Sequence, residues 1–521
     1  MALGELISKW AHNAPLPLTV LFPAAFVVGI TTIIALNVLS QLLSKPDPRL
    51  PPVVFHWVPF FGNMISFGMD PIKFLSDCQA KYGEVFTFIM FGRRMTYFMG
   101  PDGNNFVLNS KISHVSADEA YKQMTTPVFG KDVVYDVPNA KFMEQKKFIK
   151  SGISTDNLKL YVGFIQQEVE DYIKRYLDNE EGHMEIAKDI ATLIIMTASR
   201  CLMGKEIRAQ LDEGVAQLYH DLDKGFQPIN FLFPNLPLPS YRRRDIAQKK
   251  MADLFISIVQ KRRESGDFDN NDMVQSLMEQ RYKDGSPIPD YQIAHILIAL
   301  LFGGQHTSST TSCWSILRIA ENRKLLNALR EEQIRVLGDL ESPLTFEALK
   351  EMQLLDSVVR ETLRVHPPIF QLVRKVIRPV EYTKTGHIIP AGHYATIAPA
   401  VSSLSEEYFT EGKKYNPWRW TSTRENAEKD FATLQEDNKE WDLSESGQVL
   451  GGSARSPYLP FGGGRHRCIG ENFAYVQVKT VLATFIRYFD IELVDEFPKP
   501  DYSSMVVMPP HDIKIKYRLR K

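Results

Sequence analysis

The stretch 460–470, which reads PFGGGRHRCIG, constrains this chain more than any other. Three consecutive glycines leave the backbone bare, so the chain can come close to a flat object there. Cys468 follows among the cationic residues at 465–467 and directly precedes an apolar run with helical spacing. A thiolate is the form of cysteine that binds metals, and nearby cations and a helix N-terminus favour it. The stretch therefore suggests a metal-binding cysteine beside a flat, glycine-lined backbone.

Other interpretations of this stretch explain less of it. Glycine-rich loops often only turn the chain, and most lone cysteines are small core residues. A phosphate loop needs Lys-Ser or Lys-Thr after its glycines, but Arg465-His466 stands there. A zinc site needs partners, and Cys78, Cys201 and Cys313 are distant and form no Cys-x-x-Cys pair. A cysteine nucleophile would find His466 poorly placed as a base, two residues away on a tight loop.

The long apolar run at 291–320 predicts a helix through the interior, because its first half is apolar on nearly all sides. It contains Gly303-Gly304, and two glycines inside a helix cost about 1–2 kcal/mol relative to alanine. A planar group packed against the helix, or a bound dioxygen, would use the space they leave. The alternative is a plain kink in which Thr and Ser hydroxyls bond back to carbonyls.

Two polar patterns follow in the chain. Glu361 and Arg364 lie three residues apart, so they share one face of a helix that the prolines at 367–368 end. An isolated pair of this kind is usually a surface contact worth a few tenths of a kcal/mol. Arg419 stands between two tryptophans, where it can stack or form a buried pair. Alone, each pattern indicates little.

Together, in this order, these features resemble the haem-thiolate monooxygenases, the cytochrome P-450 superfamily. Phe461-x-x-Gly464-x-His466-x-Cys468-x-Gly470 matches the spacing of that family's cysteine-ligand loop. By this resemblance Glu361 and Arg364 form its Glu-x-x-Arg motif, and Arg419 completes a buried structural triad that holds the cysteine loop in place.

The stretch 303–308, GGQHTS, falls on the family's oxygen-activation motif but departs from its commonest form, which has an acid before the threonine. His306 stands there instead, and this variant resembles the sterol 14α-demethylase branch. Further matching stretches lie at 120–122, 125–130, 134–136, 144–148 and 231–235, and the fungal members look most similar. The resemblance covers roughly residues 50–520, and a polar, acid-leaning insertion at 422–454 fits the fungal type.

The N-terminus does not read as that of a soluble protein. No charged residue occurs from Ala14 to Leu43, and Leu21 to Leu43 is long enough to cross a hydrocarbon core of about 30 Å. A cleaved signal peptide would be shorter and end at a small-residue site, so a retained anchor is favoured. The slight positive excess after the span favours the cytosolic side for the following domain, and the resemblance implies the endoplasmic reticulum as its membrane. A dense run of prolines then predicts a stiff linker.

The expected organisation is a mainly α fold with small β-sheets: an interfacial segment (1–20), a single transmembrane helix (21–44), a Pro-rich linker (45–60) and one haem-thiolate monooxygenase domain (61–521). Periodicity predicts helices at 71–82, 158–177, 187–201, 214–223, 246–263, 291–320, 323–337 and 342–365. It predicts strands at 84–90, 94–99, 376–382, 387–389 and 394–397, with an aromatic, proline-bearing loop at 226–234. A net charge of −1 and a pI of about 6.9 give no indication of nucleic-acid binding.

The resemblance implies a haem b group whose iron is bound by the Cys468 thiolate, with O2 as co-substrate. It implies these cofactor-binding residues: Tyr121, Tyr135, Lys146, Arg374, Phe461, Gly462, His466 and Cys468. It implies His306 and Thr307 as catalytic residues of a proton relay, since histidine titrates near neutral pH; the alternative for His306 is an ordinary core histidine. It implies these substrate contacts: Tyr121, Phe129, Tyr135, Phe226, Leu301, Gly304, Leu372 and Met505.

The implied substrate is a sterol such as lanosterol or eburicol, which loses its 14α-methyl group as formate on the route to ergosterol. NADPH would supply electrons through a separate membrane-bound reductase, and a monomeric catalytic unit is expected. Cations near the loop (Lys146, Lys147, Lys150, Arg465 and Arg467) are candidates for meeting an acidic patch on that partner. Two alternatives stay open: another membrane haem-thiolate hydroxylase of lipids or xenobiotics, and a non-catalytic haem- or sterol-binding protein.

Overall fold

The computed structural model describes residues 18–177, 179–210, 213–234, 236–266, 272–421 and 453–520. Nearly all of the expected interfacial segment (1–20) and of the polar insertion (422–454) lies outside the described residues.

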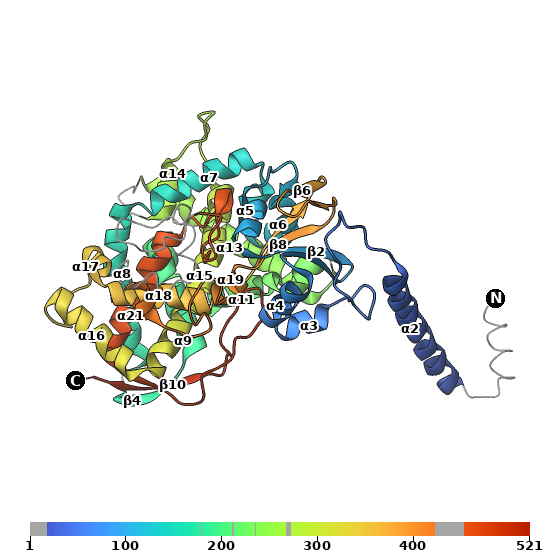
Figure 1. Cartoon of the computed structure of the whole chain (residues 1–521). Helices are drawn as coiled ribbons and strands as arrows, with labels where there is room; N and C mark the ends of the chain where they lie inside the picture. The colour runs from blue at the N-terminus through green and yellow to red at the C-terminus, as the bar shows by residue number, and fades with distance from the viewer. Residues whose placement is uncertain are drawn as a thin grey trace.

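The described residues are mainly helical, as the sequence predicts (Figure 1). The helices are α2 Leu18–Leu43, α3 Met64–Met69, α4 Pro71–Tyr82, α5 Gly100–Asn109, α6 Asp118–Phe129, α7 Asn139–Gly152, α8 Thr155–Tyr176, α9 Ile186–Ala198, α10 Gly204–Ala209, α11 Glu213–Asp223, α12 Pro228–Leu232, α13 Pro239–Ser265, α14 Met273–Glu279, α15 Asp290–Glu321, α16 Arg323–Leu337, α17 Phe346–Glu351, α18 Gln353–Val365, α19 Pro399–Leu404 and α21 Glu471–Tyr488.

Small sheets flank these helices. The largest has the strand order β1 (Val85–Met90), β2 (Arg93–Phe98), β8 (Tyr394–Ile397), β5 (Leu372–Val376) and β3 (Val115–Ser116). A second joins β4 (Glu181–Glu185), β10 (Lys514–Leu519) and β9 (Phe489–Leu493), and a hairpin pairs β6 (Val380–Tyr382) with β7 (His387–Ile389). Phe91 and Gly92 both have positive φ between β1 and β2, which suits the twist of a two-residue hairpin turn.

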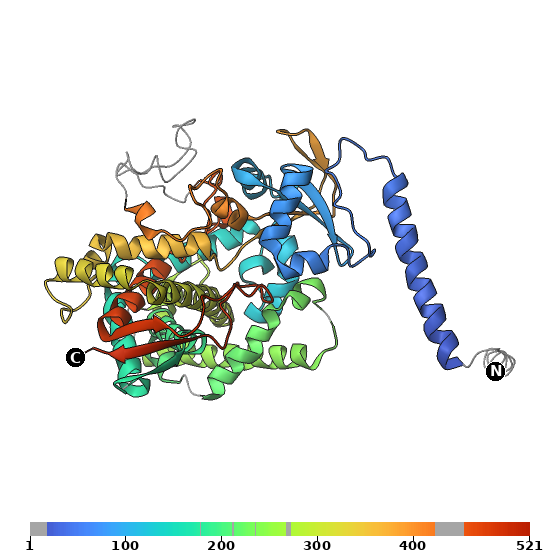
Figure 2. The same ribbon diagram turned by 60° about the horizontal axis from the view of Figure 1, so that its bottom comes forward.

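Helix α2 stands apart from the body in both views (Figure 2). Its part from Phe22 to Leu43 is long and apolar enough to cross a membrane, with a mean hydropathy of 2.1 and side chains that face outward. Near its C-terminal end, Asn37 Nδ2 donates to the carbonyls of His56 and Trp57, and Gln41 exchanges two hydrogen bonds with the His56 backbone. These contacts join the helix to the linker that leads into the body.

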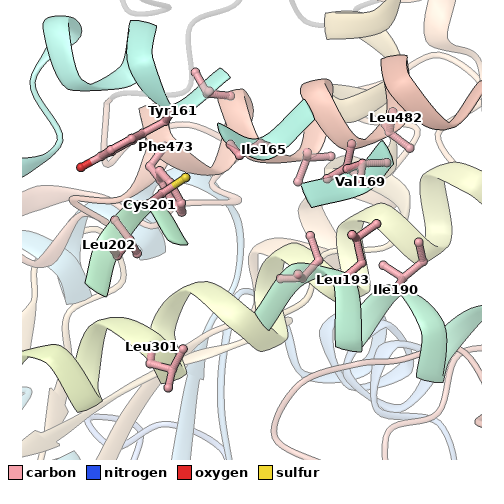
Figure 3. Packing of buried hydrophobic residues seen from close by; sticks show 14 of the residues in the cluster. Tyr161, Ile165, Val169, Ile190, Leu193, Cys201, Leu202, Leu301, Phe473 and Leu482 are labelled. Carbon is pink, nitrogen blue, oxygen red and sulfur yellow. The ribbon is translucent and has the colours of Figure 1, made fainter. Parts of the chain in front are cut away.

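The core of the body lies around α15, which packs against α9 and α21, while α8 packs on those two helices from the far side of the cluster (Figure 3). Tyr161 and Val169 from α8 meet Leu193 from α9 and Phe473 from α21 in this cluster. An interior helix of this kind can carry residues from the core directly to a buried site. The main sheet lies on the side of the body nearer to α2 (Figure 1).

Several predicted elements are confirmed at their ends, among them α4, α16, β7 and β8. The predicted helix at 342–365 is wrong, because it is two helices, α17 and α18, that meet at Met352. The buried carboxylate of Glu332 accepts hydrogen bonds from the amides of Leu354 and Leu355 and so starts α18 separately. The predicted loop at 226–234 contains the short helix α12, whose first residue, Pro228, has its φ already fixed for a helix.

Candidate active site

A cavity of about 910 Å³ lies between the loop at 459–470 and α15, with further walls from α6, β5 and the segment 501–511. Ligand pockets usually have volumes of roughly 300–1,000 Å³, so this one is near the upper end. Its lining is mostly apolar, with polar groups at the cysteine loop, on α15, near 501–511 and at single positions on other elements. The cavity can therefore hold a large, mainly apolar guest.

The cysteine loop has the flat, glycine-dependent backbone that its sequence suggests. Gly462 and Gly464 have φ of +66° and +63°, a conformation that disfavours residues with a Cβ. A Cβ on Gly464 would also lie 2.7 Å from the Asn109 side-chain oxygen. The amide of Cys468 donates to the carbonyl of Phe461 at 3.0 Å, which closes the loop.

Lys146 braces this loop. Its Nζ donates to the carbonyls of Arg465 and Arg467 at 3.0 and 2.9 Å. Arg467 itself pairs with Glu471 in the first turn of α21 at 2.8 Å. Lys146 lines the cavity, and in this structure its ammonium group holds the backbone on either side of His466.

Cys468 is exposed although it lies deep in the protein, because its side chain faces the cavity. Burial raises the pKa of its thiol, while a hydrogen bond from the Gly470 amide and the charges of Lys146 and Arg467 partly oppose this. The sequence argument that neighbouring cations favour a thiolate therefore covers only part of the balance. A bound metal ion would supply the remaining positive charge.

The opposite wall is the Gly-Gly segment of α15. A Cβ on Gly303 or Gly304 would meet no atom within 4 Å, so the glycines leave open space in the cavity. The hydroxyl of Thr307 donates to the carbonyl of Gly303 at 2.8 Å. Leu301, an expected substrate contact, is instead packed in the core, and Leu300 lines the cavity. One residue turns a helix by about 100°, so position 301 points away from the face of 300, 303, 304 and 307.

His306 also lines the cavity and has partners on α11. Its Nε2 lies 2.8 Å from a carboxylate oxygen of Asp223 and 3.0 Å from the hydroxyl of Tyr219. The Tyr219 hydroxyl in turn donates to Gln305. The Asp223 side chain is about one-third exposed and lines the cavity too. The arrangement links α15 to a partly exposed carboxylate.

Cationic and phenolic side chains gather beside the loop. The rings of Tyr121 and Tyr135 stack at 5.3 Å, and the Tyr135 ring lies 6.0 Å from the His466 ring. Burial raises the pKa of Tyr135 to about 12, and burial with nearby cations, first Arg374, lowers that of His466 to about 3. His466 Nδ1 is buried and has no hydrogen-bond partner among the described residues.

These residues fit a planar macrocycle that carries an iron ion and two carboxylates. A sulfur ligand faces the cavity from a flat loop, and bare helix backbone lies opposite it. Arg374, the two tyrosines and the unpaired nitrogen of His466 are a donor set that suits anionic carboxylates. Phe461 and Gly462 line the same cavity beside the sulfur.

The triad Glu361, Arg364 and Arg419 is fully buried. The Glu361 carboxylate accepts hydrogen bonds from Arg364, Arg419 and the Trp420 indole, at 2.8–3.3 Å. The Trp420 ring packs on Tyr458 at 5.0 Å, directly before the cysteine loop. The motif therefore lies under the segment that leads into the loop.

The other expected substrate contacts, Phe129, Phe226, Leu372 and Met505, line the cavity with Tyr121, Tyr135 and Gly304. The sequence interpretation missed Asp223, which no local pattern links to His306, 83 positions later in the chain. It also missed Gln371, a polar cavity residue between two apolar ones.

Comparisons with known proteins agree with this geometry. Residues 51–517 match the family model for cytochrome P450. The chain is 50% identical to a lanosterol 14-alpha demethylase of Cunninghamella elegans, over 100% of both chains. It is 45% identical to an eburicol 14-alpha-demethylase of Uncinula necator, over 91% of each chain. Retinoic acid-bound cyanobacterial CYP120A1 has a similar fold, with a TM-score of 0.75 and 18% identity, over 91% of this chain and 100% of that one.

Proposed function

The chain belongs to the cytochrome P450 family, and from this premise we propose that it is a membrane-anchored sterol 14α-demethylase. The observation that carries the proposal is the match to a lanosterol 14-alpha demethylase along the whole of both chains. The large, mainly apolar cavity between a cysteine loop and a glycine-bearing helix supports it. The enzyme is a haem-thiolate monooxygenase, and its substrate is a 14α-methyl sterol such as lanosterol or eburicol.

Bound haem supplies the oxidising chemistry, because its iron activates dioxygen for insertion into a C–H bond. Cys468 is the iron ligand, and the glycines beside it give the macrocycle a flat seat. Arg374, Tyr121, Tyr135 and His466 bind its carboxylates. Lys146 and the triad around Glu361 hold the cysteine loop in position.

His306, Thr307 and Asp223 deliver protons to the cavity. His306 Nε2 and the Asp223 carboxylate pass a proton between them. Asp223 exchanges this proton with water, because its side chain is partly exposed. The Thr307 hydroxyl, which also lines the cavity, passes protons toward the reacting centre. General acid–base groups of this kind typically contribute about 10²–10⁴-fold to a rate.

His306→Ala tests this relay. We expect sterol turnover to fall at least tenfold and hydrogen peroxide release per NADPH to rise, because reduced oxygen then leaves without reaching substrate. His220→Ala, at an exposed position on α11, is the matched control and should change neither quantity. Unchanged turnover and peroxide release in His306→Ala would remove His306 from the mechanism.

The sterol reaches the cavity from the lipid in which α2 is anchored, with the catalytic domain on the cytosolic side of the endoplasmic reticulum membrane. Electrons come from NADPH through a separate reductase, which meets the cations around the cysteine loop. Lys147 and Lys150 are the exposed lysines among these, whereas Lys146 and Arg467 are already engaged in the loop.

The experiment uses the full-length protein in microsomes with a yeast P450 reductase. Reduced protein should give the carbon monoxide band of a thiolate-bound haem, and lanosterol should give a type I spectral shift and a 14-demethylated product with formate. Cys468→Ala should lose the band, while Cys78→Ala, buried outside the cavity, should keep it. A band with oxidation of other lipids only would identify a different hydroxylase, and sterol binding with no product would identify a binding protein.

A further inference from the structure

A sterol carries its hydroxyl at one end of the ring system, so a pocket that orients the 14α-methyl group toward the iron gains from a donor or acceptor at that end. The inference below rests on the proposed function and concerns this recognition. Gln371 lines the cavity and is flanked in sequence by the apolar residues Phe370 and Leu372.

Gln371 lies between the outer cavity and the cysteine loop. On one side Phe370 packs on Phe67 and Tyr502, at ring distances of 6.2 and 5.6 Å. On the other side Leu372 Cδ1 would lie 3.5 Å from a Cβ on Gly462. Gln371 therefore lines the cavity between these aromatic residues and the cysteine loop.

The side chain of Gln371 is held in one orientation by Tyr97. Tyr97 is fully buried, and its hydroxyl donates to the Gln371 side-chain oxygen, its one hydrogen bond among the described residues. A buried hydroxyl pairs its proton with an acceptor wherever one is in reach, so the amide oxygen and not the nitrogen turns toward Tyr97. Burial also raises the pKa of Tyr97 well above its ordinary value, which keeps this proton in place.

The amide nitrogen of Gln371 is left as a donor toward the cavity. Within the described part of the chain it has no hydrogen-bond partner, and it is not sealed inside the protein. The backbone here is fixed as well, because the next residues belong to β5 and the Val373 amide donates to the Tyr121 hydroxyl at 2.9 Å. Because the amide oxygen and the backbone of Gln371 are both fixed, its amide donor loses little conformational entropy when a ligand binds.

We propose that the Gln371 amide nitrogen donates a hydrogen bond to the oxygen at the polar end of the sterol, and that Tyr97 is the positioning residue that aims it. The enzyme then selects substrates by an acceptor oxygen at that end, in addition to their shape. A hydroxyl and a ketone both satisfy such a donor, whereas a deoxy analogue leaves it unpaired.

Binding of three ligands to the full-length holoenzyme tests this, by titration of the type I shift with lanosterol, its 3-ketone and its 3-deoxy analogue. The wild type should bind the first two about equally and the deoxy analogue about 3- to 10-fold more weakly, as loss of one neutral hydrogen bond implies. Gln371→Leu should bind all three alike. Gln227→Leu, the same change elsewhere in the cavity lining, should keep the wild-type pattern.

Two further variants test the orientation of the amide. Gln371→Glu offers only acceptors, so it should bind lanosterol but discriminate against the ketone. Tyr97→Phe frees the amide to turn over, so the ketone should weaken about twofold relative to lanosterol, because only one of two orientations then donates.

Equal effects of Gln371→Leu on lanosterol and the deoxy analogue would overturn the inference, as would a wild type that does not discriminate between them. Failure of the proposed function looks different: the wild type itself would give no shift with lanosterol, or would bind it and release no demethylated product.

Discussion

Replacing Glu361 with glutamine should destabilise the protein strongly, although the change is nearly isosteric. Glu361 is fully buried, and its oxygen Oε2 accepts from Arg364 Nε and Trp420 Nε1, both at 2.9 Å. Burial opposes its ionisation, but the hydrogen bonds and charges of Arg364 and Arg419 outweigh this and hold its pKa below the ordinary value. The stabilisation of the folded state by the ionised Glu361 carboxylate is therefore complete at neutral pH, and it is lost only as acid protonates that carboxylate.

In Glu361→Gln an amide group takes the place of one oxygen and faces two donors, while two buried guanidinium groups lose their counter-charge. Breaking a buried ion pair from one side costs about 3–5 kcal/mol. Arg364 keeps its bonds to the carbonyls of Ser403 and Lys414, so we expect the lower part of that range. Domains are typically stable by only 5–15 kcal/mol, so this is a large fraction.

Urea unfolding of the full-length holoprotein in detergent, followed by far-ultraviolet circular dichroism, measures the effect, and the carbon monoxide band reports the cysteine loop. Glu321→Gln is the matched control, because Glu321 pairs with Arg318 at the same helical spacing, at 2.9 Å, but is exposed. It should cost less than about 1 kcal/mol. If Glu361→Gln costs no more than this control and keeps its band, the buried triad does not stabilise the loop as we argue.

Three other outcomes follow from the structure. Gly304→Ala should raise the free energy of unfolding by about 0.5–1 kcal/mol through helix propensity, but it should lower sterol turnover because its methyl group enters the cavity. The control Gly163→Ala, in open space on α8, should stabilise the protein without loss of turnover. Equal turnover of the two variants would contradict this prediction. Burial lowers the pKa of His393 to about 4, so only the unfolded state takes up the proton between pH 6.5 and 4, and stability should fall by about 2 kcal/mol over that range after allowance for screening. His393→Gln should flatten this slope in pH-dependent urea titrations, His387→Gln should leave it, and a slope unchanged by the first variant would refute the assignment. Lys146→Met should weaken haem retention during dilution, since two loop carbonyls lose a charged donor, and Lys146→Arg should restore part of it; full retention in the methionine variant would count against this role.

Local sequence signals predicted the elements whose ends are set locally. Helix α4 begins at Pro71 behind an Asp70 side chain that caps it, and both signals are visible in the sequence. The boundary between α17 and α18 is set by Glu332, a residue on another helix, so periodicity alone merged the two. Such tertiary capping leaves no trace in the segment that it divides.

The candidate site shows the same limit. The motif predicted His306 and Thr307 at the cavity, because spacing along one helix fixes their face. Asp223 and Gln371 come from segments whose approach depends on the whole fold, and no pattern near them signals it. Leu301 was expected to line the cavity but is packed in the core. Neighbouring positions on a helix point in different directions, so an assignment that is wrong by one residue moves a side chain from the cavity to the core.

The pairing of β10 with β4 joins residues 514–518 to 181–185, so a strand made late completes a sheet begun by a much earlier one. Cys468 also follows in the chain every other wall of the cavity except α21 and 501–511. Synthesis runs from the N-terminus at about 5–20 residues per second, so several seconds pass between the synthesis of α15 and that of the cysteine loop opposite it. The partly built cavity meanwhile exposes its apolar side chains. Haem capture therefore cannot precede the synthesis of Cys468, which follows that of α15 by well over a hundred residues.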